Sequence, residues 1–231
     1  MILAGGLGTR VREIAQQVPK ALLPVAGRPF IERQLELLGS NGLHDVLLCT
    51  GYLSEKIQEH VGDGARFGMR VGYSVEPAGR LMGTGGALVN ALSRLENEFL
   101  VMYGDSYLTF DFRPFISAAQ SGSWRSLMTV NHNDGSLGVS NAAVSGTKVT
   151  YFRKKPELPC EYVDYGVSWF AREVFAGLAL TPLPLDLAQI QSTLAAEGTL
   201  GAYLVSQNFH EAGSPQGLAE LESFLAASET E

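Results

Sequence analysis

The stretch Leu3-Ala4-Gly5-Gly6-Leu7-Gly8-Thr9-Arg10 lies near the start of the chain and directly follows an apolar residue, Ile2. Its glycines allow the backbone to bend sharply and to aim several N–H groups at one point, an arrangement that suits anions. A Walker A loop would have Lys and then Ser or Thr after its second glycine, and a dinucleotide fingerprint would have a third glycine in place of Val11. The stretch is therefore neither, and alone it leaves a plain glycine turn and a phosphate-binding turn both open.

Two cations near this turn favour the phosphate-binding interpretation. Arg10 ends the stretch and offers a planar fork of donors, and Lys20 follows Pro19, whose φ angle is fixed. Each cation alone would more often be a solvated surface group. Together with the glycines they predict a local site for a polyphosphate.

The rest of the chain predicts an α/β fold. Apolar runs predict strands over residues 1–4, 46–50, 70–75, 99–102, 127–130, 148–152 and 163–170. Helical spacing predicts helices over residues 29–38, 53–61, 83–95, 112–119, 185–196 and 215–226. The alternation in the first half is typical of βαβ units. We therefore expect a Rossmann-like, three-layer α/β/α fold with a mixed, mostly parallel central sheet, in which Asp105 follows a buried strand at its carboxyl end.

Composition limits the classes of protein to which the chain can belong. Its 231 residues suit a single domain spanning 1–231, with halves at 1–110 and 111–231. The net charge of -7, without a Lys/Arg-rich run, argues against a nucleic acid partner. No apolar stretch approaches the roughly 20 residues that cross a bilayer, so we expect no membrane partner and a cytoplasmic location. Cys49 and Cys160 have no metal-binding spacing, which predicts reduced thiols.

A more specific pattern appears when longer segments are considered. LAGGLGTR (3–10) and VPKALLPVAGRPFIE (18–32) resemble the signature of the sugar-1-phosphate nucleotidylyltransferases, also called nucleotide-sugar pyrophosphorylases. The resemblance continues through EPAGRLMGTGGAL (76–88), MYGDSY (102–107), RKKP (153–156), VDYGVSWF (163–170) and FHEAGSPQGL (209–218). Order and spacing are most similar to the short, single-domain branch that includes heptose-1-phosphate guanylyltransferases and N-acetylmuramate-1-phosphate uridylyltransferases. The resemblance covers nearly the whole chain and implies the nucleotidyltransferase fold.

The resemblance also implies a reaction. A sugar 1-phosphate oxygen attacks the α-phosphorus of a nucleoside triphosphate in line, pyrophosphate leaves, and the NDP-sugar supplies glycan biosynthesis. The phosphate monoester is largely dianionic at neutral pH, because its second pKa is about 6, so no general base is required. Positioning and cations, including the cofactor Mg²⁺, are the main requirements. The implied partners are the nucleoside triphosphate and the sugar 1-phosphate, with guanine and a heptose-like sugar as our first hypothesis.

Site residues follow from the matched motifs. The implied catalytic residues are Arg10, Lys20 and Asp105. The implied nucleotide-binding residues are Leu3, Ala4, Gly5, Gly6, Gly8, Thr9, Glu76, Gly83, Thr84, Gly85 and Gly86, of which the last five would lie against the base. The implied sugar-phosphate-binding residues are Lys155, Asp164 and Gly166. A helix-entry turn at Gly83–Gly86 and a solvated carboxylate at Asp164 remain alternatives, as does a core role for the aromatic residues Tyr162, Tyr165 and Trp169.

The expected metal ligands are Asp105 and Glu211. Mg²⁺ prefers hard oxygen ligands and keeps several waters, so one or two carboxylates suffice. Many relatives carry Asp where this chain has Glu211. His210 has no spaced partner and is expected to be structural.

Two other functions remain open at this point. One is a catalytically inactive regulatory subunit that senses nucleotide sugars with the same fold. The other is a glycosyltransferase, which would need a second acid in an Asp-x-Asp motif, where Tyr107 stands. Apolar positions 30–38 suit either a core or a homo-oligomer interface.

Overall fold

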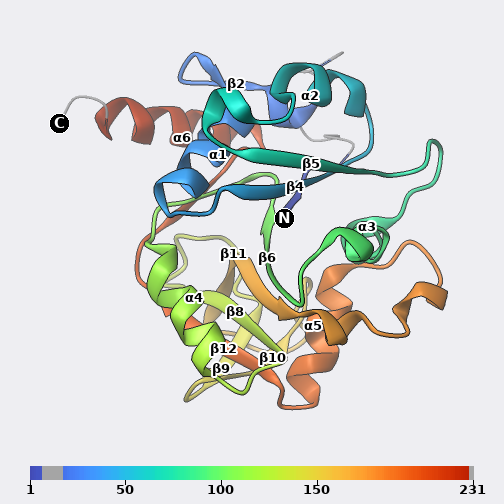
Figure 1. Ribbon diagram of the computed structural model, residues 1–231. Coiled ribbons are helices and arrows are strands. Elements are labelled where there is room, and N and C mark those ends of the chain that lie inside the picture. Colours follow the sequence, from blue (N-terminus) through green and yellow to red (C-terminus); the bar gives the residue numbers. More distant parts are fainter. Residues whose placement is uncertain (7–17, 229–231) are drawn as a thin grey trace. The chain divides into compact units, whose positions relative to one another are not determined.

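The computed structural model describes residues 1–6 and 18–228, and the chain divides into two compact units (Figure 1). Unit 1 contains Met1–Arg80, Tyr103–Leu108 and Phe209–Glu231. Unit 2 contains Leu81–Met102 and Thr109–Asn208. Each unit is thus built from separate stretches of sequence. The predicted single domain with halves that meet near residue 110 stays a prediction.

Unit 1 contains a parallel sheet with the strand order β5-β4-β1. Its strands are β1 (Ile2–Leu3), β4 (Asp45–Thr50) and β5 (Arg70–Val75). Helices α1 (Phe30–Ser40) and α2 (Ser54–Val61) lie between these strands in sequence, with the 3-10 helices η2 (Lys20–Leu22) and η3 (Ala65–Phe67). The predicted βαβ pattern is therefore confirmed in this unit.

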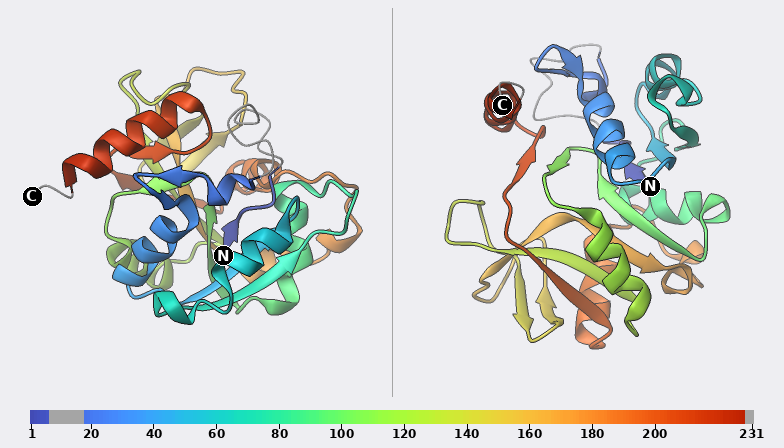
Figure 2. Two further views of the ribbon diagram at one scale, coloured as in Figure 1. Left: turned by 90° about the horizontal axis from the view of Figure 1, so that it is seen from above. Right: turned by 60° about the vertical axis from the view of Figure 1, so that its left-hand side comes forward.

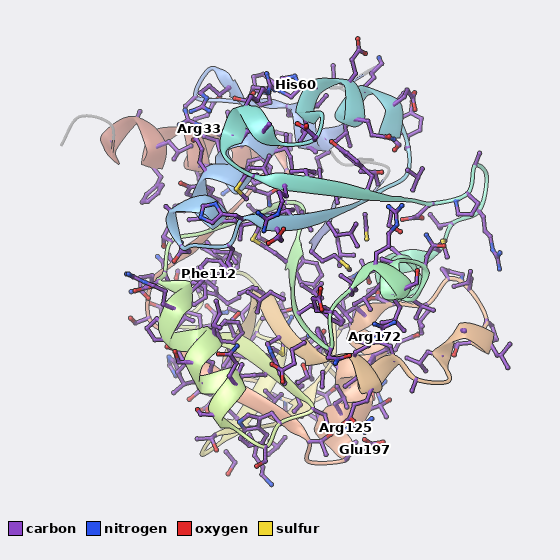
Figure 3. All side chains as sticks on the ribbon, in the orientation of Figure 1. Arg33, His60, Phe112, Arg125, Arg172 and Glu197 are labelled. Carbon is purple, nitrogen blue, oxygen red and sulfur yellow. The ribbon has the colours of Figure 1, made fainter. Side chains whose placement is uncertain are left out.

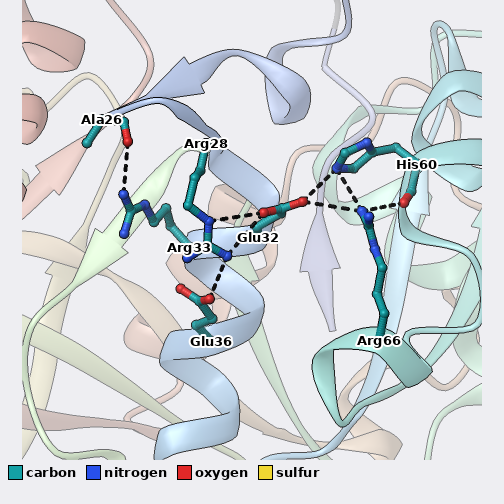
Figure 4. Close-up of polar contacts among 7 residues, drawn as sticks. All are labelled: Ala26, Arg28, Glu32, Arg33, Glu36, His60 and Arg66. Atoms are coloured by element: carbon teal, nitrogen blue, oxygen red, sulfur yellow. Dashed lines mark hydrogen bonds and ion pairs between the residues drawn. The ribbon is translucent and has the colours of Figure 1, made fainter.

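Helix α1 is held on both of its sides. Its apolar stripe buries Phe30, Ile31 and Leu35 completely, as the spacing predicts. On its polar side, Glu32 contacts His60 of α2 at 2.9 Å and Arg66 of η3 at 3.2 Å (Figure 4). These contacts tie α1 to two neighbouring elements.

The remaining elements of unit 1 form a second cluster. Strands β2 (Pro24–Val25) and β3 (Arg28–Pro29) pair with each other, as do β7 (Ser106–Leu108) and β13 (Phe209–Glu211). Helix α6 (Pro215–Ser228) packs its Leu221 and Leu225 against Val25 and Phe30. Figure 2 shows α6 beside the β2–β3 hairpin in both views. Burial of this apolar cluster fixes the C-terminal helix on unit 1.

Unit 2 is organised around a closed ring of strands. The strand order is β6-β11-β8-β12-β10-β9, and β9 also pairs with β11, which closes the last five strands. The strands are β6 (Glu98–Tyr103, with Tyr103 in unit 1), β8 (Ser126–His132), β9 (Ala142–Ser145), β10 (Lys148–Phe152), β11 (Tyr162–Ala171) and β12 (Leu200–Val205). The helices are α3 (Gly83–Ala91), η4 (Leu92–Arg94), α4 (Phe112–Ser121), η5 (Arg172–Phe175), η6 (Leu178–Leu180) and α5 (Leu187–Ala196).

The surface of unit 2 has an ion pair that joins two of these elements. Arg125 precedes β8 and lies 3.2 Å from Glu197, which follows α5 (Figure 3). Both side chains are exposed, so this pair contributes little to stability.

The mixed α/β class is confirmed, but the prediction of a mostly parallel sheet is wrong. In unit 2 only β8 and β12 run parallel among the pairings of the described strands. The reason lies in the connections. Only two residues join β9 to β10, whereas a parallel pair needs a crossover of a dozen or more residues. β9 and β10 therefore pair antiparallel.

Within the part of the chain that the structure describes, no helix has both the length and the apolar character needed to cross a membrane.

Candidate functional site

Asp105 lies in a tight turn between β6 and β7, at the carboxyl end of a buried strand as predicted. The turn packs directly on the N-terminal strand: Gly104 N donates to Leu3 O at 3.0 Å, and a Cβ on Gly104 would lie 2.4 Å from that oxygen. Ala212 N donates to Asp105 O at 2.7 Å. The backbone that carries the carboxylate is thus held by β1 and by the segment after β13.

Lys20 and Asp105 are brought together from distant parts of the sequence. Lys20 Nζ lies 2.7 Å from Asp105 Oδ2, across a separation of 85 residues. The lysine side chain is 16% exposed and the aspartate side chain 34% exposed, so the pair is partly shielded from water. Two of the three residues predicted to be catalytic therefore lie in contact with each other. The third, Arg10, lies outside the described residues.

Glu211 joins this pair at Gly213. Strand β13 pairs with β7 so that Glu211 lies opposite Ser106. A Cβ on Gly213 would lie 2.7 Å from Glu211 Oε2, 3.2 Å from Lys20 Nζ and 3.4 Å from Asp105 Oδ2. Two carboxylates and one ammonium group therefore converge on a position that has no side chain.

Ser214 orients the glutamate. Its hydroxyl donates to Glu211 Oε1 at 2.7 Å and accepts from Gly217 N at 3.0 Å. The second bond satisfies an amide in the first turn of α6, as an N-cap side chain does. Since Ser214 occupies Oε1, the other oxygen, Oε2, is the one that faces Gly213.

The donor set fits Mg²⁺. Asp105 and Glu211 offer hard carboxylate oxygens beside a glycine cradle, and Mg²⁺ needs few protein ligands because it retains waters and binds substrate phosphates. Among the described residues there is no cluster of three or more His, Cys, Asp or Glu side chains that could hold a metal by themselves. His210 has another role: its ring stacks on Phe224 with centroids 4.2 Å apart, and burial lowers its pKa.

Part of the predicted nucleotide-binding turn lies in unit 1. Leu3 ends strand β1, and Ala4 follows it and donates from its backbone N to Cys49 O at 2.8 Å. Gly5 lies against Glu76, since a Cβ on Gly5 would be 2.4 Å from Glu76 Oε1. Gly6 has open space around its Cβ position among the described atoms. Gly8 and Thr9 fall outside the described residues.

The other predicted base-contacting residues lie in unit 2, at the start of α3. The amides of Gly85 and Gly86 donate to Leu185 O at 2.9 and 3.1 Å, and a Cβ on Gly83 would lie 2.5 Å from the same oxygen. These glycines therefore permit close packing of α3 against the segment before α5. Their role at a nucleobase stays a prediction.

Thr84 connects α3 to a residue that the sequence did not single out. Its hydroxyl donates to Asp186 Oδ1 at 3.0 Å and accepts from Leu187 N at 2.9 Å. Asp186 Oδ1 also accepts from Ala188 N at 3.1 Å, and Oδ2 pairs with Lys154 at 3.1 Å. Asp186 precedes a helical pattern, so an N-cap search could have found it.

The predicted sugar-phosphate residues also lie in unit 2. Lys155 is exposed in the loop after β10. Asp164 Oδ1 accepts from Gly166 N at 3.0 Å, and Gly166 has a φ of 109°, a conformation that favours glycine. One oxygen of Asp164 thus shapes its own turn, and sugar binding by all three residues stays a prediction. Tyr165 is fully buried and Trp169 is 6% exposed, so these two aromatic residues belong to the core.

Comparisons with known proteins identify the family of the chain. The family model described as "Nucleotidyl transferase" matches residues 1–228. The chain is 37% identical over 111 residues to the D-glycero-alpha-D-manno-heptose 1-phosphate guanylyltransferase of Campylobacter jejuni, over 48% of this chain and 49% of that protein. It is 38% identical over 122 residues to the N-acetylmuramate alpha-1-phosphate uridylyltransferase of Neisseria meningitidis, over 52% of each. The chain thus spans about half the length of these two relatives.

The fold comparison extends over nearly the whole chain. A crystal structure from Bacillus anthracis, provisionally described as a glucose-1-phosphate thymidylyltransferase in complex with a sucrose, superposes with a TM-score of 0.86. The match covers 96% of this chain and 93% of that one at 23% sequence identity. At this identity the likeness concerns the fold.

Proposed function

The chain belongs to the nucleotidyl transferase family, and from this premise we propose that it is a sugar-1-phosphate nucleotidylyltransferase. It converts a nucleoside triphosphate and a sugar 1-phosphate into an NDP-sugar and pyrophosphate, which supplies glycan biosynthesis. The observation that carries the proposal is the convergence of Lys20, Asp105 and Glu211 on Gly213.

The chemistry requires two strongly negative groups to be held together. Bound Mg²⁺ supplies positive charge that offsets the charge on phosphate oxygens, and Asp105 and Glu211 would hold it. Lys20 supplies a second positive charge from the first residue of η2, where its ammonium group pairs with Asp105. Because the sugar phosphate is already a dianion at neutral pH, these residues orient and neutralise charge, and none has to remove a proton.

The remaining predicted residues would bind the two substrates. Arg10 and the glycine run, including Gly8 and Thr9, would bind the triphosphate through side-chain and backbone N–H groups. Lys155, with Asp164 and Gly166, would bind the sugar phosphate. Glu76 would contact the base, and the carboxylate that lies against Gly5 suits guanine, whose edge offers two adjacent N–H donors.

The relatives offer two specific substrate pairs to test. The name of one relative specifies guanylyl transfer to a heptose 1-phosphate, and the other specifies uridylyl transfer to N-acetylmuramate 1-phosphate. We place GTP with a heptose-like sugar 1-phosphate first, because of Glu76. The two pairs differ in both base and sugar, so one panel separates them.

The experiment is pyrophosphate release measured for GTP, UTP, CTP and dTTP against several sugar 1-phosphates in the presence of Mg²⁺. We expect release with one pair, and loss of release in Asp105→Asn. The matched control is Asp111→Asn, which changes an exposed carboxylate that pairs with the side chain of Arg113 and accepts the backbone N–H of the same residue at the start of α4. Release with no pair, combined with NDP-sugar binding by calorimetry, would favour the inactive regulatory subunit instead.

A further inference from the structure

Gln34 is a buried glutamine on α1 that contacts the turn carrying Asp105. Its side chain is fully buried. The Nε2 group donates to Tyr103 O at 3.1 Å and to Ser106 O at 2.9 Å. These two carbonyls flank Gly104 and Asp105, so one amide group donates hydrogen bonds to both ends of the turn.

The orientation of this amide follows from its surroundings. Both neighbouring groups are carbonyl acceptors, so the NH₂ side of the amide must face them, and the oxygen side would be repelled. Its Oε1 accepts no hydrogen bond from the residues that the structure describes. The side chain therefore acts as a double donor, a function that neither Glu nor an apolar residue of similar size provides.

Gln34 is well placed to influence Asp105 through the Tyr103–Ser106 turn, without contacting the Asp105 side chain. Helix α1 is itself fixed by its buried stripe and by the contacts of Glu32, so Gln34 has a rigid base (Figure 4). The turn has separate bonds to Leu3 and from Ala212, which fix its middle. Gln34 adds the bonds at its two ends and thereby restricts the direction of the Asp105 side chain.

We propose that Gln34 is a positioning residue for the candidate metal site, an inference that rests on the function proposed above. It sets the Tyr103–Ser106 turn so that Asp105 faces Lys20 and Glu211. It touches neither substrate nor metal and acts through the backbone of the turn. Groups that hydrogen-bond a metal ligand directly change metal affinity or activity by about 10- to 100-fold when they are replaced, and we expect the lower end of this range for Gln34, which acts through the backbone.

The test variant is Gln34→Met, which keeps the approximate volume and removes both donors. The matched control is Gln191→Met on α5 in unit 2. Gln191 is 1% exposed, donates from Nε2 to Ser168 Oγ at 3.1 Å, and has an Oε1 that likewise accepts no bond from the described residues. Both substitutions thus remove a buried glutamine amide, but only one lies at the Asp105 turn.

The first readout is binding of Mn²⁺ alone, titrated by electron paramagnetic resonance, with Asp105→Asn defining the site-specific part. We expect Gln34→Met to weaken this binding about tenfold or more and Gln191→Met to leave it within about twofold of the wild type. Wild-type Mn²⁺ affinity in Gln34→Met, or an equal loss in both variants, would overturn the proposal. So would the absence of any Asp105-dependent binding in the wild type.

The second readout is the Mg²⁺ dependence of pyrophosphate release. We expect Gln34→Met to raise the half-saturating Mg²⁺ concentration and to lower kcat, with a smaller change in KM for the nucleotide. If the wild type binds Mn²⁺ through Asp105 but releases no pyrophosphate, the proposed function fails while the role of Gln34 is still decided by Mn²⁺. If Gln34→Met does not fold, Gln34→Asn replaces it, because the shorter amide keeps its donors but cannot span both carbonyls.

Discussion

Gly213 lies at the centre of the candidate site, because the ends of three charged side chains surround the position that its Cβ would occupy. Gly213→Ala would place a Cβ 2.7 Å from Glu211 Oε2 and 3.2 Å from Lys20 Nζ. Both atoms are the ends of flexible side chains, so they can move without disturbing the fold. We expect kcat to fall by about tenfold or more and the melting temperature to change little. Steady-state kinetics and thermal denaturation measure the two effects.

The matched control is Gly39→Ala on α1, where a Cβ would meet only Met69 Sδ at 3.4 Å, an ordinary contact. This variant should keep wild-type turnover. Unchanged kcat in Gly213→Ala would show that the space beside Asp105 is not used in catalysis.

Lys20 is the cation that pairs with Asp105, and we expect its removal to lower activity much more than it lowers stability. Lys20→Ala leaves Asp105 exposed to water on one side, so the cost in stability is small for a partly exposed pair. Loss of a charge that faces transferred phosphates should lower kcat/KM by about 100-fold or more. Lys148→Ala, at an exposed position on β10, is the control. Similar activity in both variants would remove Lys20 from the site.

At the residue scale, charged site residues could be predicted from the sequence, whereas the uncharged residues that pack around them could not. Lys20 and Asp105 were predicted because their residue types and motifs point to phosphate chemistry, and the structure places them 2.7 Å apart. Gln34 was not predicted, because a glutamine in a helical pattern looks the same whether it faces solvent or a backbone turn. The packing role of Gly85 was also missed, since Leu185 lies far away in sequence.

At the element scale, uninterrupted apolar runs were predicted and short or interrupted strands were not. β4 and β11 match the predicted ranges to within one residue at each end, because both contain apolar residues that are buried in the sheet. β9 and β12 were missed, since β9 is a short run of mostly small residues and β12 is interrupted by Gly201 and Ala202. Because β9 was missed, the two-residue connection that makes it pair antiparallel with β10 did not enter the prediction of strand direction.

Asp186 permits a pH-dependent test of one helix. Burial alone would raise its pKa, but the Ala188 amide and the Lys154 ammonium hold the pKa below the ordinary value of 3.8. A depressed pKa in the folded state means that the charged carboxylate stabilises the fold above the unfolded pKa. This contribution is lost as the pH falls through the folded pKa. Asp186→Ala should therefore cost about 1 kcal/mol at pH 7, the value of an N-cap, and less below about pH 4.

Urea denaturation at pH 7 and at pH 3.5 measures this difference. Asp186→Asn is the control, because the amide keeps an acceptor for Ala188 but cannot ionise, so its own contribution should not vary with pH. An equal loss in Asp186→Ala at both pH values would contradict the assignment.

At the scale of the whole molecule, the charge distribution explains how an acidic chain can serve anionic substrates. The net charge is -7, which repels polyanions in general. Lys20 lies instead within a partly buried site, where water screens a charge less than at the surface. Under the proposed function, recognition of phosphates would therefore be local, in agreement with the absence of a Lys/Arg-rich run in the sequence.

Ligand binding should stabilise the folded chain in a metal-dependent way. A ligand at 100 times its Kd adds about 2.7 kcal/mol to the free energy of unfolding, which corresponds to a rise in Tm of roughly 5 to 10 °C for a chain of this size. Lys20, Asp105 and Glu211 all belong to unit 1, so a transition of unit 1 should move even if the two units unfold separately. Scanning calorimetry of the wild type with GTP and Mg²⁺, of the wild type with GTP and EDTA, and of Asp105→Asn with GTP and Mg²⁺ separates the metal-dependent rise in Tm from the rise caused by the nucleotide alone. We expect the full rise only for the wild type with metal. An equal rise in EDTA would mean that nucleotide binds without the two carboxylates.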